Sequence, residues 1–325
     1  MAADRAALQK LQQIAHLQLP FSPTPVERLP RLAATFGGDV DLSVKRDDAI
    51  PIGFGGNKIR KLFLVGAQAL EAGADTLITT GGIQSNHARA TASMAARLGL
   101  ECVLVANGTP PPKPTANALL DRLLGADIRY VATREERAPA MAAAADELRA
   151  RGKRPFVIPL GASTAHGAAA FALAVGEALA QIPAPDVIVT STSSGGTQAG
   201  LVAGCALHGI STAVIGISAD DPAAALTAEI RRIHRDLAVL IGLPPDAFAG
   251  ARIEVDDTFV GEGYGIATPE STAAIELSAQ REGLFLDPTY TGKAMAGLIA
   301  RTRSGAFAGQ RVLFWHTGGQ VGLFA

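Results

Sequence analysis

The chain has 325 residues, of which 48% are hydrophobic and 18% are charged, and its formal net charge is −1. A chain of this length forms two domains or one large one, and the composition is typical of a globular enzyme with a sizeable core. Because nucleic-acid binding depends on clustered Lys and Arg, the near-neutral charge argues against a nucleic-acid partner.

The N-terminal segment, residues 1–19, has the apolar spacing of an amphipathic helix and includes an acidic residue, unlike a signal peptide. No run approaches the ~20 apolar residues that span a membrane, so no membrane association is expected. The two cysteines, Cys102 and Cys205, lie in apolar runs and have no disulfide-framework or zinc-site spacing. We expect buried free thiols and no metal, in a soluble cytoplasmic protein.

The stretch GFGGNKIRKL, residues 53–62, runs three glycines into the start of a predicted helix. It is neither a P-loop, which needs Ser or Thr after its lysine, nor a dinucleotide fingerprint, whose third glycine position holds Lys58. One interpretation is an ordinary surface lysine. The other is a reactive lysine, because the positive helix end and the nearby Arg60 and Lys61 disfavour its ammonium form, and a lowered pKa makes an amine nucleophilic.

Downstream, one local pattern repeats: a short β-branched run, a turn rich in Gly, Ser and Thr, and an Ala-rich helix. It is clear at 75–99 and 186–209 and weaker at 156–179 and 213–233, and the strand and turn recur at 312–322. Alternating strand and helix patterns predict βαβ units and parallel sheets covered on both faces. Ligands of such sheets bind beyond the carboxyl ends of the strands, where the polar residues of 79–86, 190–198 and 316–319 lie.

Residues 81–87, GGIQSNH, place Gln84, Ser85, Asn86 and His87 between a predicted strand and an Ala-rich helix. These four hydrogen-bonding side chains are candidate ligand contacts. Ser85 or Asn86 could equally be the N-cap of the helix, and His87 could be structural, because no catalytic-triad order or metal-ligand spacing surrounds it.

Residues 193–200, SSGGTQAG, follow another predicted strand and lead into a helix expected to begin at about Gln198. Glycines let backbone N–H groups converge there, and the helix N-terminus adds positive charge, so a dianionic phosphate fits without a lysine. A plain glycine-rich turn is the alternative, but the unbroken Ser/Thr/Gly run over 192–197 favours phosphate. Combined with an activated Lys58, the economical ligand is pyridoxal 5′-phosphate.

The sequence resembles the pyridoxal-phosphate family that contains D-cysteine desulfhydrase and 1-aminocyclopropane-1-carboxylate deaminase. The resemblance extends from about Pro25 to the C-terminus and rests on six ordered blocks: KRDD (45–48), GGNKIRKL (55–62), QSNHARATA (84–92), GGTQAGL (195–201), DPTYTGKAM (287–295) and HTGG (316–319). It implies the α/β fold type II of tryptophan synthase β, with two domains that are each an open, twisted, mostly parallel sheet flanked by helices. The implied homodimer has a large cofactor-binding domain (1–60 and 171–325) and a small mobile domain (61–170) in each subunit.

The resemblance also implies roles for individual residues. Lys58 forms the internal aldimine with pyridoxal 5′-phosphate and later removes the α-proton. The other residues implied to bind the cofactor are Asn57, Asn86, Ser194, Gly195, Gly196, Thr197, Thr291 and Thr317. Those implied to meet a small amino-acid substrate are Gln84, Ser85, Asn86, Tyr264 and Tyr290, of which Ser85 and the two tyrosines are counted as catalytic with Lys58.

Two positions separate the sister activities of that family. The deaminases resemble DPVYEG and HLGG, whereas this sequence has Thr291 and Thr317 there, as the desulfhydrases do. A carboxylate at the pyridine nitrogen would keep it protonated and make the ring a strong electron sink, which helps to open a cyclopropane. Neutral threonines suffice for β-elimination, in which a good leaving group departs.

The expected function is therefore that of a pyridoxal-phosphate dependent lyase that catalyses α,β-elimination. Its best-matching substrate is D-cysteine, which would give pyruvate, ammonia and hydrogen sulfide. The alternatives are a 1-aminocyclopropane-1-carboxylate deaminase, an L-cysteate sulfo-lyase and, from another class, a non-catalytic protein that binds the cofactor. A nicotinamide enzyme is disfavoured, because the glycine fingerprint and its acidic ribose partner are missing.

Overall fold

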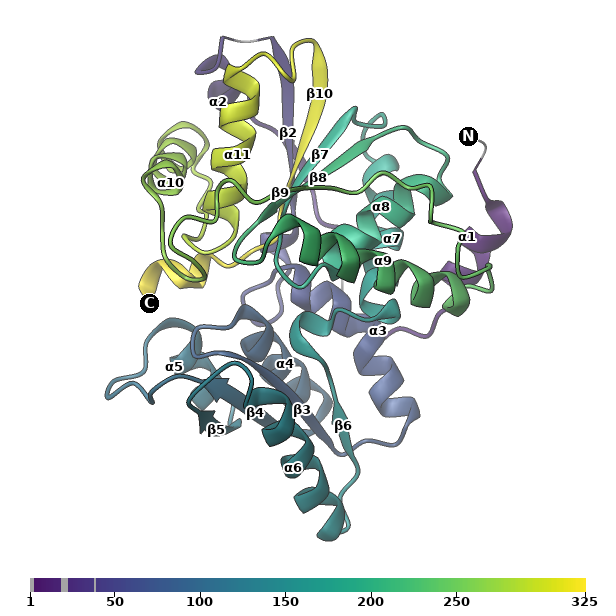
Figure 1. The fold of residues 1–325 in the computed structure, drawn as a ribbon, viewed down its shortest axis with the longest axis vertical. Helices are drawn as coiled ribbons and strands as arrows, with labels where there is room; N and C mark the ends of the chain where they lie inside the picture. Colours follow the sequence, from purple (N-terminus) through teal and green to yellow (C-terminus); the bar gives the residue numbers. More distant parts are fainter. Residues whose placement is uncertain (1–2, 19–22, 38) are drawn as a thin grey trace.

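The computed structural model describes residues 3–18, 23–37 and 39–325, which form two sheets flanked by helices (Figure 1). The larger sheet has the order β1-β2-β10-β7-β8-β9, and only β1 runs antiparallel to its neighbour. Its strands are β1 (Val26–Arg28), β2 (Val40–Arg46), β7 (Val187–Thr192), β8 (Ala213–Ser218), β9 (Glu254–Asp256) and β10 (Gln310–His316). The predicted α/β fold with mostly parallel sheets is confirmed.

The smaller sheet comes from the middle of the chain, and all of its strands are parallel, in the order β5-β4-β3-β6. These strands are β3 (Thr76–Gly82), β4 (Glu101–Asn107), β5 (Asp127–Val131) and β6 (Pro155–Val157). Helices α4 (Asn86–Leu98), α5 (Ala116–Leu123) and α6 (Arg137–Ala150) belong to this lobe, which lies below the larger one in Figure 1. The chain enters this lobe after β2 and leaves it before β7.

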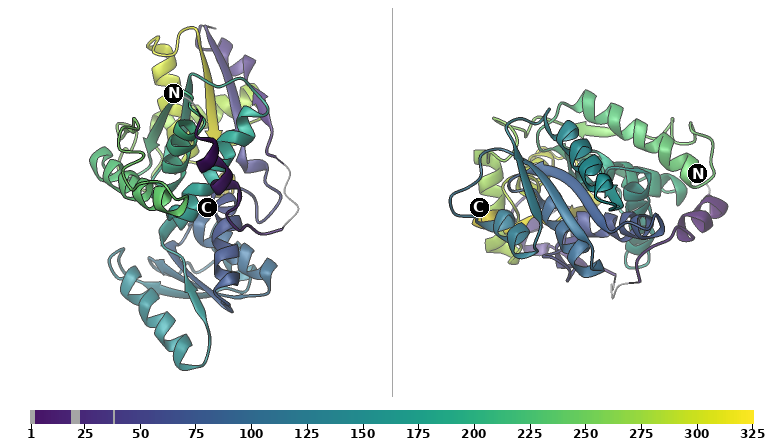
Figure 2. Two further views of the ribbon diagram at one scale, coloured as in Figure 1. Left: turned by 90° about the vertical axis from the view of Figure 1, so that its right-hand side faces the viewer. Right: turned by 90° about the horizontal axis from the view of Figure 1, so that it is seen from below.

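Helices cover both faces of the larger sheet, as its uninterrupted apolar strands require. One face packs against α2 (Pro30–Ala34), α10 (Pro269–Glu282) and α11 (Thr291–Arg303), and the other against α7 (Ala165–Leu179), α8 (Gly196–Leu207) and α9 (Ala223–Leu240). The views in Figure 2 show α9 as an outer layer, and α1 (Arg5–Gln12), the first helix of the chain, lies beside it. No helix of the described segments has both the length and the apolarity that a membrane crossing needs.

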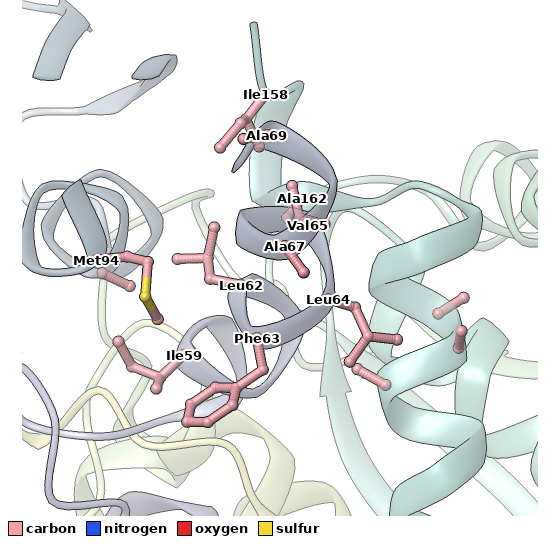
Figure 3. Packing of buried hydrophobic residues seen from close by; sticks show 14 of the residues in the cluster. Ile59, Leu62, Phe63, Leu64, Val65, Ala67, Ala69, Met94, Ile158 and Ala162 are labelled. Atoms are coloured by element: carbon pink, nitrogen blue, oxygen red, sulfur yellow. The ribbon is translucent and has the colours of Figure 1, made fainter. Parts of the chain in front are cut away.

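Helix α3 (Asn57–Glu71) lies between the two lobes and is buried on most of its surface. Its apolar side chains pack against Met94 of α4 on one side and against Ile158 and Ala162 on another (Figure 3). A helix that is buried on most of its surface belongs to the protein core, where close packing leaves its side chains little freedom. The lysine near its N-terminus is therefore held on a rigid support.

A buried cluster of four charged residues ties α3 to the larger lobe: Lys45 in β2, Asp47 in the 3₁₀ turn η1 (Asp47–Ala49), Arg60 in α3 and Glu177 in α7. Arg60 donates to Asp47 Oδ1 at 2.6 Å and to Glu177 Oε2 at 2.9 Å, and Lys45 Nζ lies 2.6 Å from Glu177 Oε1. The indole N–H of Trp315 in β10 donates to Asp47 Oδ2 at 2.8 Å. The cluster thus links two strands and two helices at one point.

Charge balance makes this burial possible. Desolvation opposes the ionisation of Glu177, but Arg60 and Lys45 outweigh it and lower the pKa of Glu177 to about 2. Two cations and two anions share the site, so each buried charge has a hydrogen-bonded opposite, and removing any one would leave its partner uncompensated.

The first prediction concerns this cluster. Asp47→Asn removes the negative charge that pairs with Arg60. We expect the free energy of unfolding to fall by about 3–5 kcal/mol, as for other buried pairs that lose one partner. Denaturant unfolding followed by the fluorescence of Trp315 measures it. The control is Asp41→Asn at the exposed Arg28–Asp41 pair, which should cost less than about 1 kcal/mol. Equal losses of unfolding free energy in the two variants would show that the buried cluster stabilises the fold no more than an exposed ion pair does.

Candidate active site

Two adjoining cavities lie where the carboxyl ends of strands from both sheets meet. The first, of about 390 Å³, is lined by Asn57, Lys58, Asn86, Ser191, Thr192, Ser193, Ser194, Gly195, Thr197, Tyr290, Thr317 and Gly318. The second, of about 540 Å³, is lined on one side by residues of the larger lobe and on the other by residues that end or follow β3, β4 and β5. Lys58, Ser193, Ser194 and Tyr290 line both, so the lysine stands at their junction.

Glycines before Lys58 let the chain lie against its neighbours. Gly55 and Gly56 have φ of 67° and 99°, in the left-handed region that favours glycine. A Cβ on Gly55 would lie 2.4 Å from the carbonyl oxygen of Asp48, and one on Gly56 would lie 2.9 Å from that of Thr317. The same Thr317 carbonyl accepts the first N–H of α3, from Asn57, at 3.0 Å. The glycine run therefore docks the start of α3 onto the turn after β10.

The amine of Lys58 is perturbed in the predicted direction, but for a different reason. Burial lowers the pKa of Lys58 to about 8, against the opposing effects of a hydrogen bond with Lys61 and of Asp220. Arg60, expected to repel it, is engaged by Asp47 and Glu177 instead. Burial and the charge of Lys58 also lower the pKa of Lys61 strongly. The two neighbouring amines thus share a site that disfavours two positive charges.

The N-terminus of α8 forms an anion-binding cup in the first cavity. The helix begins at Gly196, two residues earlier than predicted, after Gly195 at φ 74°, and no side chain caps it. Its first N–H groups therefore lack intrahelical acceptors, and the helix dipole adds positive charge. The buried hydroxyl of Thr192 also has no hydrogen-bond partner among the described residues. The Gly196 N–H already donates to Ser163 Oγ at 3.2 Å, so the donors that remain for a phosphate group are the next N–H groups of α8 and the Thr192 hydroxyl.

Most of the predicted cofactor residues line this cavity and are held by hydrogen bonds. Asn57 Nδ2 donates to Thr197 Oγ1 at 2.9 Å, and Asn86 Oδ1 accepts from Asn117 Nδ2 at 2.9 Å. The hydroxyls of Thr317 and Ser191 lie 2.9 Å apart. The predicted Gly196 does not line the cavity although its neighbours Gly195 and Thr197 do, and the structure adds four residues that the prediction lacked: Ser191, Thr192, Ser193 and Gly318.

Two predicted residues lie elsewhere. The hydroxyl of Thr291 donates to Asp287 Oδ1 at 2.7 Å and accepts from the N–H of Asp287 at 2.8 Å, so it belongs to the cap of α11 and lines neither cavity. The side chain of Gln84 bonds to the backbone of Thr115 and Asn117, at 3.3 and 3.0 Å, and lines neither cavity. Of the two threonines expected to separate the sister activities, Thr291 and Thr317, only Thr317 lines the candidate site.

The second cavity holds the predicted serine and tyrosines. Ser85 caps α4 by accepting from the N–H of Ala88 at 3.2 Å, which confirms the N-cap interpretation, and it also lines the cavity, where it could contact a ligand. The hydroxyls of Tyr264 and Tyr290 lie 2.6 Å apart with their rings edge to face. Burial raises the pKa of Tyr290 well above its usual value, so both hydroxyls keep their protons near neutral pH.

The residues of the second cavity that were not among the predicted site residues include Asn107, Arg134, Arg137 and Asp220. The two arginines belong to the charged run TREER, which follows β5, and a charged run after a parallel strand is a signal that could have identified them. His87 also lines this cavity, and its Nε2 lies 2.8 Å from the hydroxyl of Thr79. Burial lowers the pKa of His87 strongly, so this histidine is neutral.

Comparisons with known proteins agree with this geometry. A family model described as "Pyridoxal-phosphate dependent enzyme" matches residues 17–318. The chain is 39% identical to a 1-aminocyclopropane-1-carboxylate deaminase of Methylobacterium nodulans, over 96% of this chain and 97% of that one. It is also 39% identical to a D-cysteine desulfhydrase of Yersinia pestis, over 98% and 97% of the two chains.

Solved structures show the same likeness. One described as an ACC deaminase homologue superimposes with a TM-score of 0.90 at 34% identity, covering 98% of this chain and 96% of the other. A threonine deaminase from Solanum lycopersicum has a TM-score of 0.71 at 17% identity, over 98% and 91% of the two chains, which shows a shared fold alone. The family resemblance drawn from the six sequence blocks is confirmed.

The second prediction concerns the ionisation of Lys58 in protein freed of cofactor. Only a neutral amine is acylated, so trace labelling with acetic anhydride should increase with pH through a midpoint near 8 at Lys58. Mass spectrometry of the peptides measures it. Lys153, whose pKa is raised by its bond to Glu101, is the internal control and should titrate at higher pH. Coincident midpoints for the two lysines would contradict the proposed effect of burial.

Proposed function

This chain belongs to the family of pyridoxal-phosphate dependent enzymes, and from that premise we propose that it is a carbon–sulfur lyase acting by α,β-elimination. The representative substrate is D-cysteine, and the products are pyruvate, ammonia and hydrogen sulfide. One observation carries the proposal: the amine of Lys58, with its lowered pKa, stands between an anion cup and a cavity lined by two hydroxyl-paired tyrosines.

The first cavity fits the cofactor. The N–H groups at the start of α8 and the unpartnered hydroxyl of Thr192 would hold the phosphate. Asn57 and Asn86 would flank the ring, and the Ser191–Thr317 hydroxyl pair would meet its nitrogen. When bound, pyridoxal 5′-phosphate supplies an aldehyde that condenses with amines and a ring that accepts the electron pair released at the α-carbon.

The chain's own side chains perform the proton transfers in this proposal. Lys58 Nζ removes the α-proton, because an amine with a pKa of about 8 is partly unprotonated near neutral pH and regains a proton readily. Tyr290, supported by Tyr264, donates a hydrogen bond that stabilises the departing sulfur, since both hydroxyls stay protonated. The N-terminus of α4, with Ser85, holds the α-carboxylate at the positive end of a helix.

The neutral surroundings favour elimination over ring opening. No carboxylate lines the first cavity among the described residues, so nothing there would keep the ring nitrogen protonated. The deaminase activity remains the second candidate, because a relative of that name is as similar to this chain as the desulfhydrase. A non-catalytic role would leave the two tyrosines and Ser85 without a function.

We propose two further properties at the level of the whole protein. Residues 61–170 would form a small lobe that moves against residues 1–60 and 171–325, since each part holds its own parallel sheet. The working form would be a homodimer in the cytoplasm, where two buried free cysteines stay reduced.

The third prediction tests the lysine. Lys58→Ala should abolish the yellow absorption of the lysine-bound cofactor, and it should lower the rate of sulfide and pyruvate release from D-cysteine by at least about 100-fold, the usual contribution of a general base. Borohydride reduction followed by peptide mapping should place the cofactor on Lys58 in the unsubstituted protein. Lys153→Ala is the matched control and should behave as the unsubstituted protein.

The outcomes of this experiment separate the candidate functions. Turnover of D-cysteine by Lys58→Ala without an added amine would refute the assignment of the lysine. Ammonia release from 1-aminocyclopropane-1-carboxylate, with no sulfide from D-cysteine, would replace the lyase with the deaminase. Cofactor attached to Lys58 with no turnover of any β-substituted amino acid would leave the non-catalytic role.

The fourth prediction tests the cup. A Cβ on Gly196 would lie 2.6 Å from Ser163 Oγ and 2.9 Å from Lys61 Nζ, so Gly196→Ala must displace the loop that presents the N–H groups. We expect the affinity for pyridoxal phosphate to fall by about 10-fold or more, in line with the cost of overpacking. Equilibrium dialysis measures it. Gly250→Ala is the control, because a Cβ there meets nothing within 4 Å, and an equal loss in that variant would contradict the prediction.

A further inference from the structure

Two arginines face the second cavity from one short segment of the small lobe. Arg134 follows β5, and its guanidinium donates to Asp220 Oδ2 at 3.0 Å and lies 5.3 Å from the centre of the Tyr264 ring. Arg137 begins α6, and its Nε donates to the backbone oxygen of Arg134 at 3.0 Å. The contacts of Arg134 with the large lobe therefore fix the position of Arg137 in the cavity.

The charges that line this cavity do not balance. Its cations are Lys58, Arg134 and Arg137, and its one carboxylate among the described residues, Asp220, is paired with Arg134. Arg137 forms no ion pair among the described residues, and burial together with Arg134 lowers its pKa against the smaller opposing effects of Tyr264, Glu135 and Asp220. A half-buried cation without a partner is costly, and an anion brought by a ligand would remove that cost.

The α-carboxylate of an amino acid does not account for Arg137. In the function proposed above, that carboxylate lies at the N-terminus of α4 beside Ser85, a site that is itself favourable for an anion. Arg137 is then available to bind a second negative group on the same substrate. The planar fork of a guanidinium matches the paired oxygens of a sulfonate, phosphate or carboxylate.

We propose, as an extension of the function above, that Arg137 binds a negatively charged β-substituent and that Arg134 positions it. Besides a thiol, the site then accepts amino acids whose leaving group is an oxyanion, such as a β-sulfonate, a sulfate ester or a phosphate ester. A neutral thiol would use the same proton transfers but not this contact.

The elimination of a β-sulfonate balances without an external oxidant or reductant. The α-proton moves to Lys58 Nζ, the Cβ–S bond breaks with its electron pair on sulfur, and sulfite departs as the Cα–Cβ double bond forms. One water then hydrolyses the enamine to pyruvate and ammonium. The leaving group gains negative charge as the bond breaks, so Arg137 binds the transition state more tightly than the substrate.

The test compares Arg137→Gln with the unsubstituted holoenzyme on charged and neutral β-substituents. The charged substrates are cysteate and O-phosphoserine, the neutral one is β-chloroalanine, and both enantiomers of each are assayed. We expect kcat/KM to fall by about 10- to 100-fold for the charged substrates, the effect of charge-assisted hydrogen bonds, and to change by less than about twofold for β-chloroalanine. Arg134→Gln should lose part of the same selectivity, and Arg134→Lys should restore it.

Arg129→Gln is the matched control, because Arg129 pairs with Asp127 and Glu147 and lines neither cavity. It should leave every rate unchanged. A uniform loss across charged and neutral substrates in Arg137→Gln would assign Arg137 to the α-carboxylate or to folding, and would overturn the proposal. No loss on any substrate would overturn it as well.

Binding without turnover separates this proposal from the proposed function. Aspartate carries a β-carboxylate and alanine carries none, so calorimetry should show tighter binding of aspartate by the holoenzyme, and the preference should disappear in Arg137→Gln. If the holoenzyme turns over none of the substrates, the proposed lyase function is wrong. The preference for aspartate over alanine then still tests whether Arg137 binds a β-substituent. Equal binding of aspartate and alanine by the unsubstituted protein would refute that role.

Discussion

The buried ion cluster of Lys45, Asp47, Arg60 and Glu177 is the constraint on which the candidate site depends. Four charges removed from water are stable only if each keeps its hydrogen-bonded partner, so the elements that carry them have one permitted arrangement. Those elements are β2, η1, α3 and α7, and Trp315 adds β10 to them. Because Lys58 lies two residues before Arg60, the cluster also sets where the reactive amine points.

The two cavities of the site differ in the charges that line them. The first has neutral walls apart from Lys58, and it offers N–H groups and hydroxyls to a dianion. The second carries an excess of cations opposite a pair of protonated tyrosines. Burial at the junction lowers the pKa of Lys58, and the same burial would strengthen its interaction with any bound anion. A fold that many chemistries share thus acquires its chemistry from side chains at the strand ends.

Relatives with different names are equally similar to this chain, so overall identity does not separate their activities. The separation must come from a few groups in the cavities. In the proposed function, the Ser191–Thr317 hydroxyl pair would contact the ring nitrogen, and Arg137 would contact the β-substituent. Sites that place a buried polar group against a substrate group discriminate strongly, because a substrate without that group leaves the polar partner unpaired.

The sequence by itself determined the alternation of strands and helices and the parallel sheets, and it identified Lys58 and the glycine-rich turn before α8 as candidate site residues. Each of these is encoded locally, in apolar periodicity or in a run of glycines and hydroxyls, and local patterns do not depend on distant packing. The family resemblance supported the cofactor already inferred from Lys58 and that turn, and it added most of the residues that line the first cavity.

Only the tertiary structure decided which distant segments meet. Thr291 bonds with Asp287 rather than facing the cavity, Gln84 bonds with the segment around Asn117, and Arg60 pairs with Glu177 of a helix more than a hundred residues away. The contact between Arg134 and Asp220 joins the two lobes, and no local pattern contains it. These contacts form because two sheets pack around α3. The same packing buries Lys58 and partly buries Arg137, and burial lowers the pKa of both side chains.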